Sequence, residues 1–374
     1  MTVNLGTGSA TSTAGVSGIQ DVVGTSGNDA ITAGAIGGTL TGNGGSDTLF
    51  GGSGPDTFVV GPTQAASTTI DGGSGSNTLV AANIVNSWNI TGANSGSLNA
   101  IAFANVQRLM GGTAADTFTS GTSGNVSGSI VGGGGLDSLV AANGSNAWNI
   151  TAGNTGSLNG IAFSGIANLT GGTSNDVFSF GSAGFVGGAV NGGGGNDVLN
   201  FSSRSAGAVV NLQTGAATAV GAGISNIEIV HGGSGADTLT GNATGNVLIG
   251  GGGADTISGG NGRSVLIGRN GNDKIKGGNA DDIIIGGSTD FDANYTALAS
   301  ILAEWQSNNP YTTRISHLKG NSSGGLNGGN ILTFGGTVHD DGTTTSLTGG
   351  AGSDWFFTGA NSSITDRQAG EQVN

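Results

Sequence analysis

The sequence predicts an all-β fold built as a solenoid of short stacked repeats. Of its 374 residues 80 are Gly, whereas only 9% are charged and 5% aromatic, a composition typical of repeat architectures or of disordered chains. Apolar residues make up 35% of the chain and recur in register, which is enough to bury a thin continuous core. The third observation is a period of nine residues, and a fixed period decides the architecture.

The nine-residue period is clearest between Gly232 and Ile285. Six units follow one another there without a gap: GGSGADTLT, GNATGNVLI, GGGGADTIS, GGNGRSVLI, GRNGNDKIK and GGNADDIII. A second block runs from Gly24 to Val59 and ends in GGSGPDTFV, a full match to the pattern G-G-x-G-x-D-x-U-x, where U is apolar. Glycine permits positive φ and close backbone approach, so we expect tight turns alternating with short strands that point one apolar side chain inward.

These nonapeptides resemble the repeats of RTX proteins, also called haemolysin-type calcium-binding proteins, and the C-terminal portions of large repeat-rich bacterial secreted or surface proteins. The resemblance implies that six residues of each unit turn around Ca²⁺, that three form a strand, and that two units complete one coil of a right-handed parallel β-roll. It also implies type I secretion, with the chain unfolded in the low-calcium cytosol and folded outside the cell.

The sixth position of the nonapeptide carries the candidate calcium ligands. Ca²⁺ takes six to eight oxygen ligands from carboxylates and backbone carbonyls, and a Gly-rich turn that ends in Asp offers both. Ordinary turn formation is the alternative for any single Asp. We predict these calcium ligands: Asp29, Asp47, Asp56, Asp137, Asp197, Asp237, Asp255, Asp273, Asp282 and Asp354.

The nonapeptide spacing sorts these aspartates by edge. Turns on one edge are two units apart, so Asp237, Asp255 and Asp273 form one ladder, while the opposite edge carries Asn246, Ser264 and Asp282 and should bind less calcium. Asp29 and Asp47 share an edge and Asp56 lies on the other, whereas Asp137, Asp197 and Asp354 sit in isolated motifs. Stacked strands place like charges roughly 5 Å apart, at a cost of very roughly 1 kcal/mol per pair in water. We therefore expect folding to depend on calcium.

A longer repeat of 60 residues separates the two nonapeptide blocks. Trp88-Asn89-Ile90-Thr91 reappears as Trp148-Asn149-Ile150-Thr151, and Ile101-Ala102-Phe103 reappears as Ile161-Ala162-Phe163. We expect about three coils of roughly twenty residues per unit, with both tryptophans packed in the core rather than stacked on a sugar. Val3-Asn4-Leu5 recurs as Val210-Asn211-Leu212, so the chain begins inside a repeat, which favours a fragment of a longer protein or a truncated gene start.

The nonapeptide pattern stops after Ile285, where a helix is expected. Asp292 is a suitable cap, Pro310 a suitable end, and the apolar residues between them fall on one face: Tyr295, Leu298, Ile301, Leu302 and Trp305. The outward positions of the alternate repeats form an apolar patch of Val247, Ile249, Val265, Ile267, Ile283 and Ile285. We expect the helix to cover this patch and cap the roll; the alternative is a partner or self-association surface.

These features divide the chain into four expected segments: solenoid coils with RTX nonapeptides at 1–60, the 60-residue repeats at 61–231, a calcium-binding β-roll at 232–287 and a capping segment with the helix at 288–374. The net charge of −14 argues against nucleic acid and anionic membrane partners. No apolar stretch is long enough for a membrane span, and cysteine is absent.

The sequence favours a binding and structural role over catalysis. Neither H-E-x-x-H nor G-x-S-x-G occurs, and the three histidines, His231, His317 and His339, are scattered. We expect an extracellular or cell-surface calcium-binding scaffold of the adhesin type, with calcium ions and a surface, matrix or self-association partner. The alternative is an accessory region that aids the secretion and folding of a larger secreted enzyme such as a hydrolase.

Overall fold

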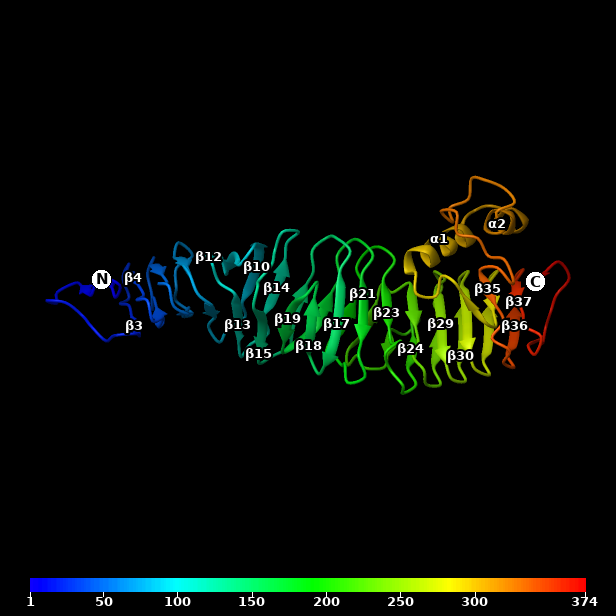
Figure 1. Ribbon diagram of the computed structural model, residues 1–374, viewed down its shortest axis with the longest axis horizontal. Coiled ribbons are helices and arrows are strands. Elements are labelled where there is room, and N and C mark those ends of the chain that lie inside the picture. Colours follow the sequence, from blue (N-terminus) through cyan, green and yellow to red (C-terminus); the bar gives the residue numbers. More distant parts are fainter. The chain divides into compact units, whose positions relative to one another are not determined.

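The computed structural model describes residues 1–374 as two compact units, each built almost entirely from short strands (Figure 1). Unit 1 comprises Met1–Ser174 and Phe185–Ala189, and unit 2 comprises Asn175–Gly184 and Val190–Asn374. In both units the chain alternates between two sheets, and most neighbouring strands are parallel. The predicted all-β parallel solenoid is confirmed.

Unit 1 contains two stacks of strands. In spatial order the first stack holds β2 (Ser9–Ala10), β1 (Thr2–Asn4), β4 (Ala30–Thr32), β6 (Thr48–Phe50), β8 (Thr69–Asp71), β12 (Ile101–Ala104), β11 (Ser95–Leu98), β10 (Ser87–Gly92), β14 (Thr117–Ser120), β16 (Asp137–Val140) and β20 (Ile166–Thr170). The second holds β3 (Val22–Val23), β5 (Thr39–Thr41), β7 (Thr57–Val59), β9 (Thr78–Val80), β13 (Arg108–Gly112), β15 (Ser129–Gly133), β19 (Ile161–Ser164), β18 (Thr155–Leu158) and β17 (Ala147–Ala152).

Unit 2 repeats this arrangement. Its first stack holds β21 (Val177–Phe180), β23 (Val198–Asn200), β27 (Ile229–His231), β29 (Val247–Gly252), β31 (Val265–Asn270), β33 (Ile283–Ile285), β37 (Trp355–Phe357) and β39 (Gln372–Val373). The second holds β25 (Ala216–Ala217), β24 (Val209–Asn211), β28 (Thr238–Thr240), β30 (Thr256–Gly260), β32 (Lys274–Gly278), β36 (Ser346–Gly350) and β38 (Ser363–Ile364). In addition β26 (Gly223–Ser225) pairs with β22 (Ala189–Asn191), and β34 (Ser288–Thr289) and β35 (Val338–His339) form a separate two-stranded sheet.

The apolar eighth position of each nonapeptide lines the interior. Leu239 pairs with Ile257, Ile257 with Ile275 and Ile275 with Leu347, and these side chains are at most 1% exposed. Because successive side chains of a strand point to opposite faces, the residues on either side of this position face outward. The nine-residue period thus places one core residue per strand in register with those above and below.

The 60-residue repeat contains two and a half coils, so the expected three coils are wrong. From β8 onward the chain visits the first stack, the second, the first again for the antiparallel meander β10–β11–β12, the second at β13 and the first at β14. The meander keeps residues 87–104 in one sheet. These residues would otherwise be long enough to form one more half-coil, so the unit has five half-coils and not six. Five half-coils place equivalent residues on opposite sheets, so Trp88 and Trp148 lie in different stacks.

Both tryptophans are core residues, as expected. Trp88 stacks on Phe118 with ring centroids 5.3 Å apart, and Trp148 meets Phe163 edge-on at 6.2 Å. Their exposed fractions are 0% and 1%. Aromatic pairs of this kind add to the hydrophobic burial of the rings. Buried rings of this kind have no face available for a sugar.

Two helices interrupt the roll between β33 and β36. The expected helix is present as α1 (Tyr295–Gln306), but its cap is Asn294, whose side chain accepts a hydrogen bond from the Ala297 N–H. Asp292 instead accepts from Thr289 and pairs with Arg269. Pro310 does not end α1; it immediately precedes a second, unpredicted helix, α2 (Tyr311–Leu318). Neither helix has the length and apolar character that a membrane span requires.

The apolar patch on unit 2 is covered by α1, as the sequence predicts (Figure 1). Leu298, Ile301 and Trp305 belong to one buried cluster with all six patch residues, and each of these side chains is at most 1% exposed. The helix covers the side of this sheet, while β36 to β39 form the last coils of the roll. The patch is therefore an internal interface and not a free surface of the unit.

Replacing Leu298 with Ala tests how strongly this interface stabilises unit 2. We expect the variant to lose about 2–5 kcal/mol of unfolding free energy, because a buried leucine is removed and a cavity remains. Urea denaturation in calcium, followed by tryptophan fluorescence, measures the change. Thr296→Ala is the control, since Thr296 is exposed on the same helix. Equal stability of the two variants would contradict the packing described here.

Candidate calcium-binding turns

The aspartate of each nonapeptide folds back over the first glycine of its own turn. A Cβ atom added to Gly250 would lie 2.3 Å from Oδ2 of Asp255, and one added to Gly232 would lie 2.3 Å from Oδ2 of Asp237. Within the same turn Gly251 has φ +112°, a conformation that side chains with a Cβ rarely adopt. The glycines therefore create the space that the carboxylate occupies.

The predicted ladder Asp237, Asp255 and Asp273 is present on one edge of unit 2. The backbone N–H of Asp237 donates to Oδ1 of Asp255 at 2.7 Å, and that of Asp255 donates to Oδ1 of Asp273 at 2.9 Å. The carboxylates of Asp255 and Asp273 thus each accept a hydrogen bond from the aspartate one coil earlier, 18 residues before. One oxygen of each side chain is committed to holding adjacent coils together.

The opposite edge carries a second ladder that extends further than expected. The N–H of Asn246 donates to Ser264 Oγ, that of Ser264 to Asp282 Oδ1, and that of Asp282 to Asp354 Oδ1. Asp354 follows Asp282 by 72 residues, because the helical insertion leaves the roll and the chain then returns to the next position of the stack. An aspartate that looks isolated in the sequence is therefore a neighbour of Asp282.

Aspartates of the other predicted turns also stack. In unit 1 Asp29 donates to Asp47 Oδ1 and Asp56 to Asn77 Oδ1, which places Asp29 and Asp47 on one ladder as expected. Two aspartates outside the predicted set continue this pattern: Asp116 donates to Asp137 Oδ1 within unit 1, and Asp176 donates to Asp197 Oδ1 within unit 2. The two aspartates of each pair are 21 residues apart. The nonapeptide spacing predicts neighbours 18 residues apart and therefore does not pair them.

Most of these carboxylates keep one buried oxygen that accepts no hydrogen bond. The atoms are Oδ2 of Asp137, Asp197, Asp255, Asp273, Asp282 and Asp354, together with Oδ1 of Asp56. Their residues are at most 1% exposed. A buried acceptor without a donor costs the full desolvation of that group, and the cost is larger for a charged group. These oxygens are suited to a hard cation.

Three predicted ligands are satisfied by the protein itself. Asp29 accepts from the N-terminal ammonium group and from Thr25, Asp47 accepts from Asp29 and Gln64, and Asp237 accepts from Ala208 and Gly233. No three His, Cys, Asp or Glu side chains converge as a metal cluster anywhere in residues 1–374. A calcium ion in these turns must therefore take much of its shell from backbone carbonyls, which calcium readily accepts.

Burial and stacking make these carboxyl groups hard to ionise. Burial raises the pKa of Asp255 to about 7, and the neighbouring carboxylates of Asp273 and Asp237 add to the effect. Burial likewise raises the pKa of Asp273 to about 6, with a contribution from Asp341. The pKa of Asp282 lies well above its ordinary value, chiefly through burial and then through Asp354. A bound cation would favour the ionised form of each group.

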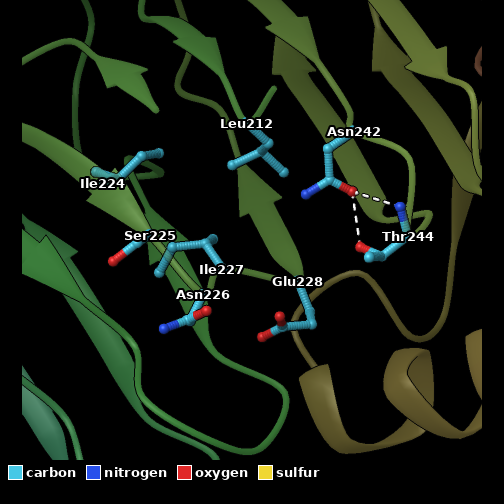
Figure 2. A pocket seen from close by; sticks show the side chains of 8 residues that line it. All are labelled: Leu212, Ile224, Ser225, Asn226, Ile227, Glu228, Asn242 and Thr244. Carbon is cyan, nitrogen blue, oxygen red and sulfur yellow. Dashed lines mark hydrogen bonds between the residues drawn. The ribbon is translucent and has the colours of Figure 1, made fainter. Parts of the chain in front are cut away.

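Glu228 adds a further carboxylate to the stack, although it belongs to no nonapeptide motif. The backbone N–H of Asp197 donates to Oε2 of Glu228 at 2.9 Å. Glu228 also lines a pocket of about 130 Å³, together with Asn242 and Thr244 (Figure 2). The backbone N–H and the hydroxyl of Thr244 both donate hydrogen bonds to Asn242 Oδ1. Glu228 is half-buried and its pKa is raised by that burial. Unlike the buried aspartates, the Glu228 carboxylate is partly exposed to solvent through this pocket.

Comparison with known families agrees with this geometry. The family model described as the RTX calcium-binding nonapeptide repeat (4 copies) matches residues 39–59, 190–203, 231–266, 258–290 and 345–362. These segments contain Asp47, Asp56, Asp197, Asp237, Asp255, Asp273, Asp282 and Asp354; Asp29 and Asp137 lie outside them. No curated protein matches the chain. The stacked turns and the matched segments together show that the chain carries RTX calcium-binding nonapeptide repeats.

Proposed function

We propose that the chain is an extracellular scaffold whose coils are held together by calcium bound in the nonapeptide turns. The observation that supports this proposal is the set of buried aspartate oxygens without a hydrogen-bond donor. An apolar or neutral turn would avoid their desolvation cost, so their retention is best explained by a ligand. The resemblance to RTX proteins implies type I secretion and folding outside the cell, where calcium sites need only bind at about 10⁻⁴–10⁻³ M.

The two carboxylate oxygens of each ladder aspartate have different roles in the proposed binding. In the main ladder Oδ1 of Asp255 and of Asp273 holds the preceding coil, which leaves Oδ2 of each group for the ion. The glycines bring carbonyl groups of stacked turns close to that oxygen: a Cβ added to Gly250 would lie 2.8 Å from the carbonyl oxygen of Gly268, in the next coil. Calcium, when bound, supplies the positive charge that offsets the stacked carboxylates.

We propose adhesion or matrix assembly, without catalysis, as the role of this scaffold. The outward positions beside the main ladder are polar and accessible, including Thr238, Thr256 and Lys274, and would form the contact surface. His317 and Glu304 form a close pair at 2.7 Å, but both are buried in the helical insertion, where they support its packing. An accessory role beside a secreted enzyme would rest on the same calcium chemistry; hydrolase activity of this chain alone would contradict the non-catalytic proposal.

Asp255→Asn tests the calcium ladder directly. We expect it to lower the number of bound calcium ions by one or two per chain and to reduce the calcium-induced rise in Tm, because the variant removes a charged ligand but keeps an acceptor oxygen. One site contributes about 2.7 kcal/mol when free calcium exceeds its Kd a hundredfold. Calorimetric titration and far-ultraviolet circular dichroism, with calcium and then chelator, measure both effects.

Asp290→Asn is the matched control for this experiment. It removes the same charge from a side chain that is 56% exposed and lies outside the ladders. We expect its calcium stoichiometry to equal that of the unaltered chain. If chelation leaves the strand signal of the unaltered chain unchanged, calcium does not support the fold and the proposed function is wrong.

The raised pKa values predict an unusual pH dependence for the metal-free chain. Asp255 and Asp273 hold protons up to about pH 7 and 6 in the folded state, whereas an unfolded aspartate loses its proton near pH 3.9. Between about pH 4 and pH 7 the folded state therefore binds more protons than the unfolded state. The stability of the metal-free chain is greatest at the lower end of this pH range and falls as pH rises through 6–7. Calcium competes with those protons and should remove this advantage of low pH.

Thermal melts of calcium-stripped protein check the sign. We expect a higher Tm at about pH 5 than at about pH 8 without calcium, and the opposite order in millimolar calcium. A calcium-free chain that is less stable at the lower pH would show that these carboxyl groups do not govern the pH dependence of folding.

A further inference from the structure

The last coil of unit 2 adds a carboxylate to the second ladder. Trp355 in β37 pairs with Gln372 in β39, so Glu371 lies beside Asp354 on the next coil. Glu371 is 6% exposed, and its Oε2 accepts a hydrogen bond from the Gln368 N–H. Its Oε1 is buried and has no donor. The residue lies beyond the last segment that matches the nonapeptide family, which ends at 362.

Asp354 presents a matching unpaired oxygen. Its Oδ1 accepts from the Asp282 N–H at 2.7 Å, while its Oδ2 is buried and has no donor. The carboxyl groups of Asp354 and Glu371 lie within hydrogen-bonding reach of each other. Two buried acceptors in contact repel unless a proton or a cation lies between them.

The basic side chains of the helical insertion do not supply that charge. Lys319 donates to the Asn374 side chain at 3.1 Å, and Arg314 pairs with Asp281. Neither cation contacts the unpaired oxygen of Asp354 or of Glu371. The charge that would offset this pair is therefore not provided by the protein.

The last coil is held beside this pair by a short strand pairing, and elsewhere by Asp366, which accepts hydrogen bonds from the Gly349 and Gly350 N–H groups. β39 is two residues long, and the Gln372 N–H donates to the Tyr311 hydroxyl at 3.1 Å. That hydroxyl donates in turn to the backbone carbonyl of Asp354 at 2.6 Å. Repulsion between Asp354 and Glu371 would act directly across this short pairing, so its relief would strengthen the docking of β39 on β37.

We propose that Glu371, which lies outside the nonapeptide motif, joins the motif aspartate Asp354 in an additional calcium site that fastens the last coil to the roll. The ligands are all oxygens, a donor set that suits calcium and disfavours softer metals. Two carboxylates do not complete the shell, so backbone carbonyls of the adjoining turns must contribute. This inference rests on the proposed calcium function but assigns a ligand, Glu371, that the repeats do not contain.

Glu371→Gln tests the site, because the amide keeps the length of the side chain and can donate a hydrogen bond to Asp354. We expect calorimetric titration with Ca²⁺ alone to find about one ion fewer per chain. Hydrogen exchange of residues 359–374 supplies a second readout. In the unaltered chain this segment should be protected only in calcium, and in the variant it should be equally protected with and without calcium.

Asp290→Asn and Asp255→Asn serve as controls. The first should behave as the unaltered chain, and the second should lose calcium while residues 359–374 keep their calcium-dependent protection. Unchanged stoichiometry in Glu371→Gln, with Asp255→Asn still losing ions, overturns this site alone; no calcium bound by the unaltered chain overturns the proposed function as well. If Glu371→Gln fails to fold, Glu371→Asp replaces it, and calcium affinity equal to that of the unaltered chain would then overturn the inference.

Discussion

The structure depends on aspartates that are buried in most of the turns, the majority of them with only one oxygen hydrogen-bonded. Oδ1 of Asp255 holds the coil before it, and Oδ2 lies over Gly250 without a donor. The glycine content and the nine-residue period both follow from this arrangement. A Cβ at the first position would occupy the space of the carboxylate, and only turns stacked in register place each aspartate at the N–H group from which it accepts a hydrogen bond. The turns hold a high density of buried carboxyl groups, and under the proposed function the fold is coupled to the cation that offsets their charge.

The two edges of unit 2 solve the same stacking problem in different ways. Along the main ladder the stacked groups are Asp237, Asp255 and Asp273, which need an external charge. On the other edge the corresponding positions of two coils are the neutral Asn246 and Ser264, and protein donors lie there instead. The Gln306 amide at the end of α1 donates to the carbonyls of Thr244 and Arg263, which belong to successive coils. The helical insertion therefore ties together turns that carry no carboxylate, and this is the edge beside the patch that α1 covers.

The sequence predicts those parts of the molecule that depend on the period alone. A strict repeat of nine residues determines which side chains face inward, which aspartates share an edge, and which outward positions form the patch beneath Leu298 and Trp305. It does not reveal partners whose spacing departs from that period. Asp137 lies 21 residues from its neighbour Asp116, and Asp354 lies 72 from Asp282, because coils of another length or an inserted subdomain intervene. Glu371 belongs to no motif at all, and only the pairing of β37 with β39 places it in the ladder.

The same dependence on nearest neighbours explains how the roll accommodates a large insertion. In a solenoid each coil contacts only those beside it, so the chain can leave the stack wherever it can return to an equivalent position. After β33 it departs for the two helices and returns with Ile275 opposite Leu347 and Ile284 opposite Phe356. The apolar pairs alone would allow a shift of two residues, because alternate side chains face the same way. The hydrogen bond from the Asp282 N–H to Asp354 Oδ1 excludes such a shift, because only one register brings the Asp354 carboxylate next to that N–H group. The ladder of stacked aspartates that the proposed function assigns to calcium is therefore also what specifies the register.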